Sequence, residues 1–359
     1  MQRLALTIAG AAGALFLGSA AVLAQPPAPA SASCAPGAKL SYICGLRAPE
    51  DLVQVPGASW IIASGLANAQ QPGSGGLYLI NETTKTAAKV ALPNTGAPSA
   101  PYDKCPGPLN PQTFSAHGLS IRPMGPRRAH LFVVGHGGRE AIEVFEVSSG
   151  GAPKLAWIGC ITPPAGTFMN SVTALADGRI FATNFYNAPL TMQDALQGKD
   201  TGWVMQWKPG GQFEKVGGTD LPGPNGIEIT PDYKWLFVAV TGTGRVVRFD
   251  LNDTWKAPTV INPNLRADNL RWGPDGKLLL AGPGPEPNCN PSSPPRGLAN
   301  PCRQGPAVVS LDPVSLKTTD VLRIAPEAAF PGHAAALISG KTLWLGTYNG
   351  DRVAYSPLP

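Results

Sequence analysis

Five side chains with oxygen atoms stand at or next to the start of short apolar segments that are far apart in the chain. Two are carboxylates and three are carboxamides: Glu50, Asn170, Asn225, Asp268 and Asn269. A hard cation such as calcium prefers oxygen ligands of this kind, about six to eight at once. Zinc is disfavoured because it takes histidine, cysteine or carboxylate ligands in a tetrahedral shell. The set therefore predicts a calcium site that leaves room for water or a substrate oxygen, at which a carbonyl group can be polarised.

Two histidines supply groups that move protons near neutral pH. His117 opens one apolar segment and His136 closes the next, so antiparallel pairing of the two segments would bring the rings together. One ring can then take a proton from water while the other fixes its tautomer. Asp268 is a rival base, because a carboxylate beside a cation can do the same work. The alternative is that both histidines are hydrogen-bonded structural residues.

A sixfold repeat is the element that must position these side chains. Each copy has a polar residue, a short strand, a turn and a second strand, and a third strand follows. Its opening residues are Asp51, His117, Asn170, Asn225, Asp268 and His333, spaced by 66, 53, 55, 43 and 65 residues. The paired strands are expected at 50–55 with 60–64, 117–121 with 131–136, 170–175 with 180–184, 225–229 with 236–240, 268–272 with 278–281, and 333–337 with 343–347.

A period near fifty residues with three or four strands per copy is typical of a β-propeller, here an all-β fold with six blades and a central channel. The innermost strand of each blade runs along that channel. The opening residues, His333 included, would therefore meet in one ring at one mouth of the channel. The alternative is that polar residues open strands simply because strands begin at turns, where Asn and Asp are common.

Composition agrees with many short strands and turns, since the chain has 42 Gly, 39 Pro and 14% charged residues but 43% hydrophobic residues. The formal net charge is +5, yet the basic residues are scattered and form no stripe. A nucleic-acid or membrane-surface role is therefore not expected. The chain also lacks a Gly-x-Ser-x-Gly elbow, a phosphate-binding loop and a His-Glu-x-x-His motif, which argues against serine hydrolases and nucleotide-dependent enzymes.

The N-terminus predicts export. Residues 1–24 have the layout of a secretory signal peptide, 25–40 form a Pro/Ala/Ser-rich linker, and 41–359 form a single propeller domain. A membrane anchor is the alternative for residues 1–24. We expect a secreted or periplasmic monomer, free of the membrane once the signal is cleaved.

Six cysteines in an exported chain predict disulfides, although the number of possible pairings is 15. Two pairs are close in sequence, Cys34 with Cys44 and Cys289 with Cys302. If both form, Cys105 is left with Cys160.

Seven segments resemble the paraoxonase/arylesterase family in order and spacing, and more broadly the gluconolactonase and strictosidine-synthase-like six-bladed propellers. The segments are Glu50-Asp51-Leu52, His117-Gly118-Leu119-Ser120, Val134-Gly135-His136, Ile142-Glu143-Val144-Phe145, Asn170, Asn225-Gly226-Ile227 with Pro231-Asp232, and Asp268-Asn269. The likeness spans about residues 48–355. It implies calcium-dependent hydrolysis of small lactones or aryl esters, with Glu50, Asn170, Asn225, Asp268 and Asn269 as calcium ligands and His117 with His136 as the histidine dyad.

The chain departs from the family's pattern at a second, structural calcium. The resemblance places that ion at Asp51, at the backbone carbonyl of Leu119 and at an Asp for which this chain has Ser171. One calcium is therefore expected and a second is not supported. Two other functions stay open: a non-catalytic binding propeller with a structural ion, and a lyase of the strictosidine-synthase kind, which calls for an acidic residue in place of the metal ring.

Overall fold

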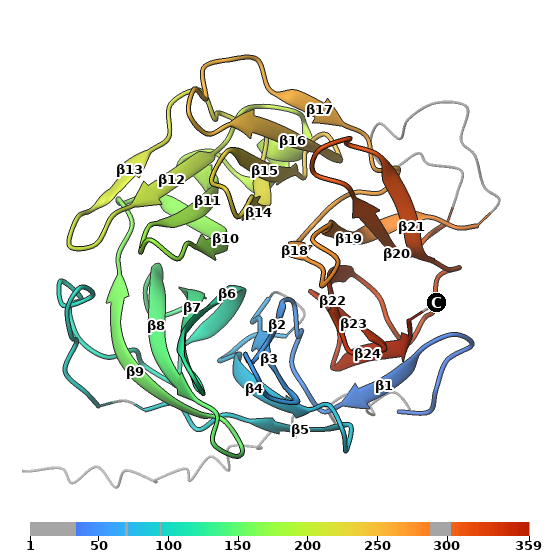
Figure 1. Cartoon of the computed structure of the whole chain (residues 1–359), viewed down its shortest axis with the longest axis horizontal. Coiled ribbons are helices and arrows are strands. Elements are labelled where there is room, and N and C mark those ends of the chain that lie inside the picture. The colour runs from blue at the N-terminus through green and yellow to red at the C-terminus, as the bar shows by residue number, and fades with distance from the viewer. Residues whose placement is uncertain (1–33, 69–70, 94, 288–302, 359) are drawn as a thin grey trace, which may run out of the picture. The chain divides into compact units, whose positions relative to one another are not determined.

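The computed structural model describes residues 34–68, 71–93, 95–287 and 303–358. Residues Cys34–Pro359 form one compact unit, in which six four-stranded antiparallel sheets surround a central axis (Figure 1). The prediction of an all-β, six-bladed propeller is confirmed. The predicted signal peptide and most of the predicted linker lie outside the described residues.

Five blades are built from four consecutive strands each, with the first strand innermost. The first blade holds β2 (Leu52–Gln54), β3 (Trp60–Gly65), β4 (Gly76–Asn81) and β5 (Thr86–Lys89). The second holds β6 (Ser115–Gly125), β7 (Arg128–His136), β8 (Ala141–Ser148) and β9 (Lys154–Ile161). The third holds β10 (Thr167–Ala174), β11 (Ile180–Asn187), β12 (Trp203–Trp207) and β13 (Phe213–Lys215).

The fourth blade holds β14 (Pro224–Ile229), β15 (Trp235–Val240), β16 (Arg245–Asp250) and β17 (Thr259–Ile261). The fifth holds β18 (Leu270–Trp272), β19 (Leu278–Pro285), β20 (Gln304–Leu311) and β21 (Thr318–Arg323). A short helix, α1 (Met192–Leu196), lies between β11 and β12. Among the described residues, no helix has the length and hydrophobicity needed to cross a membrane.

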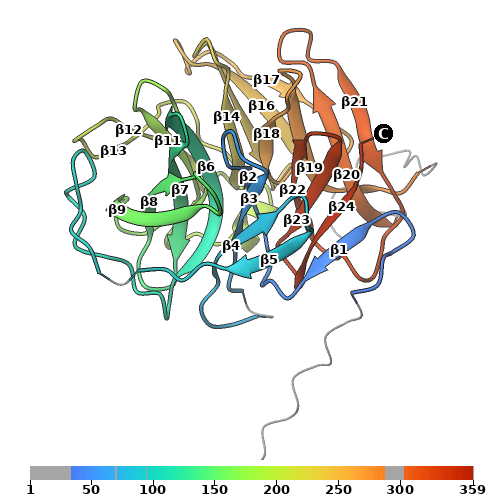
Figure 2. The same ribbon diagram turned by 60° about the horizontal axis from the view of Figure 1, so that its bottom comes forward.

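The sixth blade joins the two ends of the domain. Its strands are β22 (His333–Ser339), β23 (Thr342–Thr347), β24 (Arg352–Pro357) and, outermost, β1 (Ser41–Cys44). In this sheet Ser41 pairs with Tyr355 and Cys44 pairs with Arg352. The repeat pattern did not identify β1, because its partner strand lies at the other end of the chain. Pairing β1 with β24 closes the ring of blades (Figure 2).

Hydrophobic packing is divided among the blades rather than gathered in one centre. On β7, Leu131 and Val133 pack against the first blade, whereas Phe132 and Val134 pack against the third. Successive side chains of a strand point to opposite faces, so a strand buried on both faces is apolar throughout. Six such clusters, one between each pair of neighbouring blades, hold the described part of the propeller together.

Two of the predicted disulfides are confirmed. Cys34 is bonded to Cys44, next to the closing strand β1, and Cys105 is bonded to Cys160 at the end of β9. The first bridge ties the start of the described domain to the sixth blade. Cys289 and Cys302 lie outside the described residues.

Candidate functional site

Three inner strands have a β-bulge at the residue that was predicted to face the channel. The pairing register shifts between Ala116 and Leu119 on β6, between Met169 and Val172 on β10, and between Pro224 and Ile227 on β14. The shifted positions contain His117, Asn170 and Asn225. A bulge leaves a residue out of the regular ladder and turns its side chain to a new direction. These bulges allow the three polar side chains to point in a direction that the regular up-and-down alternation of side chains along a strand would not give.

Two glycines permit neighbouring blades to approach closely at this mouth. A Cβ atom on Gly118 would lie 2.5 Å from the carbonyl oxygen of Asn170, and a Cβ atom on Gly226 would lie 2.4 Å from that of Asp268. Neither distance is sterically possible, so both positions need glycine. The Gly226 amide donates a hydrogen bond of 3.0 Å to the Asp268 carbonyl. The backbones at Asn170 and Asp268 are thus fixed against the neighbouring blade.

Four of the predicted oxygen-bearing residues form two pairs through direct side-chain contacts. The Asn269 amide donates to Oε1 of Glu50 at 2.7 Å, although the two residues are 219 positions apart. Asn225 hydrogen-bonds the carboxyl group of Asp268, and its Nδ2 also donates to Thr241 at 3.1 Å. The backbone of Asn170 lies against Gly118 of the neighbouring blade. All five residues are buried, or have carboxyl groups that are buried.

Unsatisfied oxygens provide the test of whether these residues fit a metal ion. Four buried side-chain oxygens have no hydrogen-bond partner, one each from Glu50, Asn170, Asn225 and Asn269. Buried polar atoms are normally paired, and a common partner of positive charge would satisfy these four acceptors, all of them on predicted ligands. The described residues contain no cluster of three or more His, Cys, Asp or Glu side chains suited to a metal. The predicted set differs because three of its five residues are amides.

The two carboxyl groups of the ring are in an environment that disfavours their negative charge. Burial raises the pKa of Glu50 well above its usual range, and the charges of Asp268 and Asp51 raise it further, against lowering by Asn269 and Arg271. Burial also raises the pKa of Asp268 to about 7, although the hydrogen bond from Asn225 lowers it. A cation between the two groups would favour both charged forms.

His117 and His136 lie together as predicted, with Nδ1 of His117 3.0 Å from Nε2 of His136. The carboxylate of Glu140 accepts a hydrogen bond, so Nδ1 of His136 must donate it. When His136 is neutral, its Nε2 accepts a hydrogen bond from Nδ1 of His117. In that tautomer Nε2 of His117 keeps a lone pair, and this nitrogen lies 3.8 Å from Oε1 of Glu50. The basic nitrogen therefore faces the candidate metal site.

Burial, and then the neighbouring ring of His136, lower the pKa of His117 well below its usual 6.5. The ring is therefore neutral at physiological pH, which is the form a general base needs.

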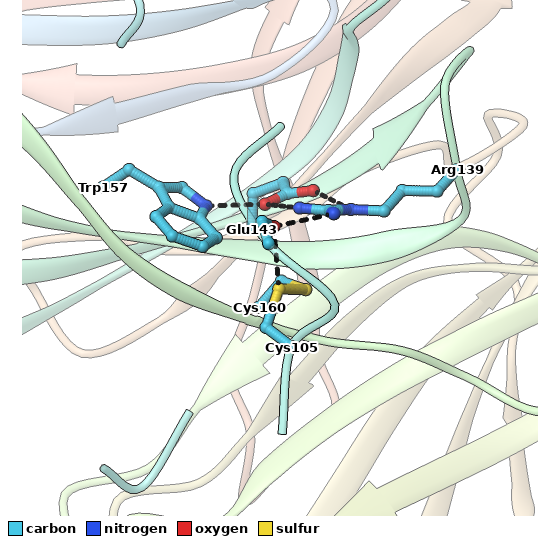
Figure 3. The surroundings of a disulfide bond; sticks show 6 residues. Cys105, Arg139, Glu143, Trp157 and Cys160 are labelled. Carbon is cyan, nitrogen blue, oxygen red and sulfur yellow. Dashed lines mark hydrogen bonds and ion pairs between the residues drawn. A yellow bond between two sulfur atoms is a disulfide. The ribbon is translucent and has the colours of Figure 1, made fainter. Parts of the chain in front are cut away.

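Sequence reasoning missed Glu140, which follows β7 in a loop and belongs to no repeat position. The neighbouring Arg139 donates to both carboxylate oxygens of Glu143, at 2.7 and 2.9 Å. Trp157 donates to the same carboxylate at 2.7 Å. Figure 3 shows this cluster beside the Cys105–Cys160 bridge. Because Glu143 is buried and its charge is paired, the cluster anchors the loop that presents Glu140 to His136.

Aromatic rings form a stack at the same mouth. Phe168 lies parallel to His136, with 4.6 Å between ring centroids, and Tyr186 lies parallel to Phe168 at 4.7 Å. Both aromatic residues are only partly buried. The stack orients the His136 ring and offers an apolar wall to a ligand.

His333 opens β22 as predicted but is turned away from metal ligation. Its Nδ1 lies 3.2 Å from the Gly282 carbonyl and its Nε2 lies 3.1 Å from the Ala335 carbonyl. Burial lowers its pKa to about 4, despite these two acceptors. The ring is thus engaged with the backbone on both sides, and it links the fifth and sixth blades.

A cavity of about 360 Å³ lies further along the channel from these residues. Its walls include Ser120, Thr173, Glu228 and Arg271 from four inner strands or their continuations, and none of the seven predicted site residues lines it. Burial raises the pKa of Glu228 from 4.5 to about 7, although Arg271 and a hydrogen bond from Thr173 lower it.

Glu228 is expected to make the fold less stable as pH rises. A carboxyl group whose pKa is higher in the folded chain stabilises the fold at low pH, and this contribution is lost as pH rises through the folded value. For a pKa raised from 4.5 to about 7, the loss can reach about 3 kcal/mol. Glu228→Gln stays neutral, so urea unfolding should show it to be more stable than wild type at about pH 8 and similar at about pH 5. Glu214→Gln, at an exposed position of β13, is the matched control; equal pH dependence in all three proteins would contradict the assignment.

The chain is similar to known proteins in sequence and in structure. Residues 120–280 match the SMP-30/Gluconolactonase/LRE-like region. The serum paraoxonase/lactonase 3 of Homo sapiens is 24% identical over 261 residues, which cover 68% of this chain and 70% of that protein. The corresponding protein of Oryctolagus cuniculus is 25% identical over 265 residues, with the same shares covered.

Solved structures share the fold at low sequence identity. A gluconolactonase from Xanthomonas campestris is 16% identical with a TM-score of 0.53, and the match covers 89% of both chains. A calcium-binding protein, regucalcin, from Agrobacterium tumefaciens is 11% identical with a TM-score of 0.51, and the match covers 90% of this chain and 94% of that one.

Proposed function

We propose that this chain, which is similar to the serum paraoxonase/lactonases and to the SMP-30/gluconolactonase-like region, is a calcium-dependent hydrolase of small lactones or aryl esters. The observation that carries the proposal is the group of four buried oxygens without a hydrogen-bond partner, on predicted ligands that include Glu50, the residue that lies 3.8 Å from the hydrogen-bonded His117. A metal that polarises a carbonyl and a base that activates water are the two requirements of such a hydrolysis.

Five residues would hold the calcium ion: Glu50, Asn170, Asn225, Asp268 and Asn269. Their two carboxylates and three amides match the preference of calcium for oxygen ligands. When bound there, the ion would supply Lewis acidity toward a carbonyl oxygen and offset the negative charge that develops on it. The regucalcin neighbour, a calcium-binding protein on the same fold, agrees with this choice of metal.

The histidine pair supplies the base. Nε2 of His117 would accept a proton from a water molecule that attacks the carbonyl carbon, and His136 would share the resulting positive charge through the 3.0 Å hydrogen bond. Glu140 holds His136 in the required tautomer and stabilises the charged pair. Asp268 remains the alternative base, since its pKa is about 7.

The substrate would be a small molecule with an apolar part. Phe168 and Tyr186 stack beside His136 and offer a flat, partly exposed wall to an aryl or alkyl group. We also propose that the chain is exported, because its described domain carries two disulfides and its relatives are serum proteins.

A chelation experiment tests the proposal. The purified protein is assayed on a panel of lactones and aryl esters before and after treatment with EGTA, with calcium-saturated EGTA as the control. We expect turnover to fall at least about 100-fold and to return on addition of calcium. Turnover that survives removal of the metal would refute the calcium requirement. A calcium-dependent melting temperature without turnover on any substrate would instead indicate a binding propeller with a structural ion.

A further inference from the structure

A buried guanidinium lies in the channel below the candidate metal site. The Arg271 side chain, on β18, is only 15% exposed, and the Asp51 carboxylate that faces it is 1% exposed. Nη2 of Arg271 donates to both carboxylate oxygens of Asp51 at 2.8 Å. The same nitrogen donates to the carbonyl oxygen of Leu119 at 3.0 Å. Nη1 lies 3.6 Å from Oε1 of Glu228.

These contacts connect four of the six blades through one side chain. Asp51 precedes β2, Leu119 lies on β6, Glu228 on β14 and Arg271 on β18. The Asp51 carboxylate also accepts the backbone amides of Leu52 at 2.8 Å and Leu119 at 2.7 Å. Its charge is thus matched by a cation, and both oxygens are occupied by donors.

The atoms around the guanidinium are those that an inorganic cation would use. Two carboxylates and a backbone carbonyl converge from separate strands, and all are hard oxygen ligands. Asp51 and the Leu119 carbonyl are the two ligands that the family resemblance reserves for a second calcium. Ser171, which stands where a third acidic ligand would be needed, lies beside the same turn, since a Cβ atom on Gly118 would be 2.7 Å from its Cα atom.

We propose that Arg271 is a built-in cation that takes the place of a second metal ion in the channel. The guanidinium supplies the positive charge that joins the blades. The protein therefore holds one ion, at the five predicted calcium ligands, and it stays folded when that ion is removed. The expectation of one bound calcium ion rests on the proposed function, whereas the role of Arg271 rests on its own contacts.

Arg271→Met tests the charge while keeping most of the side-chain volume. Loss of the guanidinium leaves the buried Asp51 carboxylate without a counter-charge, and we expect the melting temperature to fall by about 10 °C whether or not calcium is present. Arg271→Lys keeps a positive charge with fewer donors, so its melting temperature should fall less than that of Arg271→Met. This variant also provides the test if Arg271→Met does not fold. Arg128→Met, which breaks an exposed ion pair with Glu146, is the control and should change the melting temperature little.

Metal content separates this proposal from the proposed function. Wild type should contain one calcium per chain by mass spectrometry of the protein-bound metal, and chelation should leave it folded. Arg271→Ala opens the position toward the adjoining cavity, so millimolar calcium should add a second ion and restore part of the lost melting temperature. Two ions in wild type, no gain of an ion in Arg271→Ala, or full stability of Arg271→Met would overturn the proposal. Wild type without calcium, combined with a destabilised Arg271→Met and the rescue of Arg271→Ala, would refute only the calcium-dependent hydrolase.

Discussion

Asp268→Asn protein is expected to lose at least about 100-fold in kcat/KM on any lactone or aryl ester that the wild-type chain hydrolyses. The substitution keeps the shape of the side chain and removes one of the two carboxylates proposed to bind calcium. The amide still accepts a hydrogen bond from Asn225, so the contact that fixes Asp268 in the fold can persist. Because the carboxyl group is buried and its pKa is already about 7, removing its charge should not destabilise the fold.

Calcium titration by calorimetry tells which role Asp268 has. If Asp268 is a ligand, Asp268→Asn should bind calcium much more weakly, and high calcium should recover part of the activity. If it is the base, calcium affinity should remain near that of wild type while turnover is lost. Asp103→Asn, at an exposed position, is the matched control. Full activity with unchanged chelator sensitivity in folded Asp268→Asn and Asn225→Ala proteins would show that the site is elsewhere.

His117→Gln protein is expected to lose about 100- to 10,000-fold in kcat, the usual contribution of a general base. The change should be confined to kcat, because His117 is not among the proposed calcium ligands and calcium affinity should stay near that of wild type. His130→Gln, on β7 of the same blade, is the matched control; its ring packs near Tyr102 and Phe132 and away from the relay. A kcat near that of wild type would assign His117 a structural role and favour Asp268 as the base.

The pH dependence gives a separate readout for the relay. A base must be unprotonated, so activity rises with pH through the pKa of His117. Burial and His136 hold that pKa well below 6.5, and the acidic limb of the kcat/KM profile should therefore lie below pH 6.5. Glu140→Gln should move this limb further toward low pH and reduce kcat less than His117→Gln does, because Glu140 acts through His136. An acidic limb that stays unchanged in His117→Gln would contradict the assignment.

Local patterns in the sequence were sufficient for the blades and for the residue types at their strand openings. Apolar stretches such as 236–240 and the Pro231-Asp232 turn depend only on neighbouring residues, so six copies of the pattern predicted six blades. The pairing of His117 with His136 followed from antiparallel strands within one blade, and the structure places them 3.0 Å apart. Assignment of the five oxygen-bearing residues to one calcium stays a prediction.

Contacts between distant parts of the chain decided the rest. The closing strand β1 pairs with β24, and Arg271 meets Asp51 across 220 residues. The repeats predicted neither contact, although Asp51 opens the first repeat and Arg271 lies in the fifth, since each contact joins segments whose own patterns are satisfied locally. Glu140 was missed because its role depends on the loop that Arg139 and Glu143 anchor. The sequence by itself thus determined the six blades and the chemistry available at their openings. Only the tertiary structure decided which charges meet, because the closed ring of blades determines which cation lies within contact distance of a buried carboxylate.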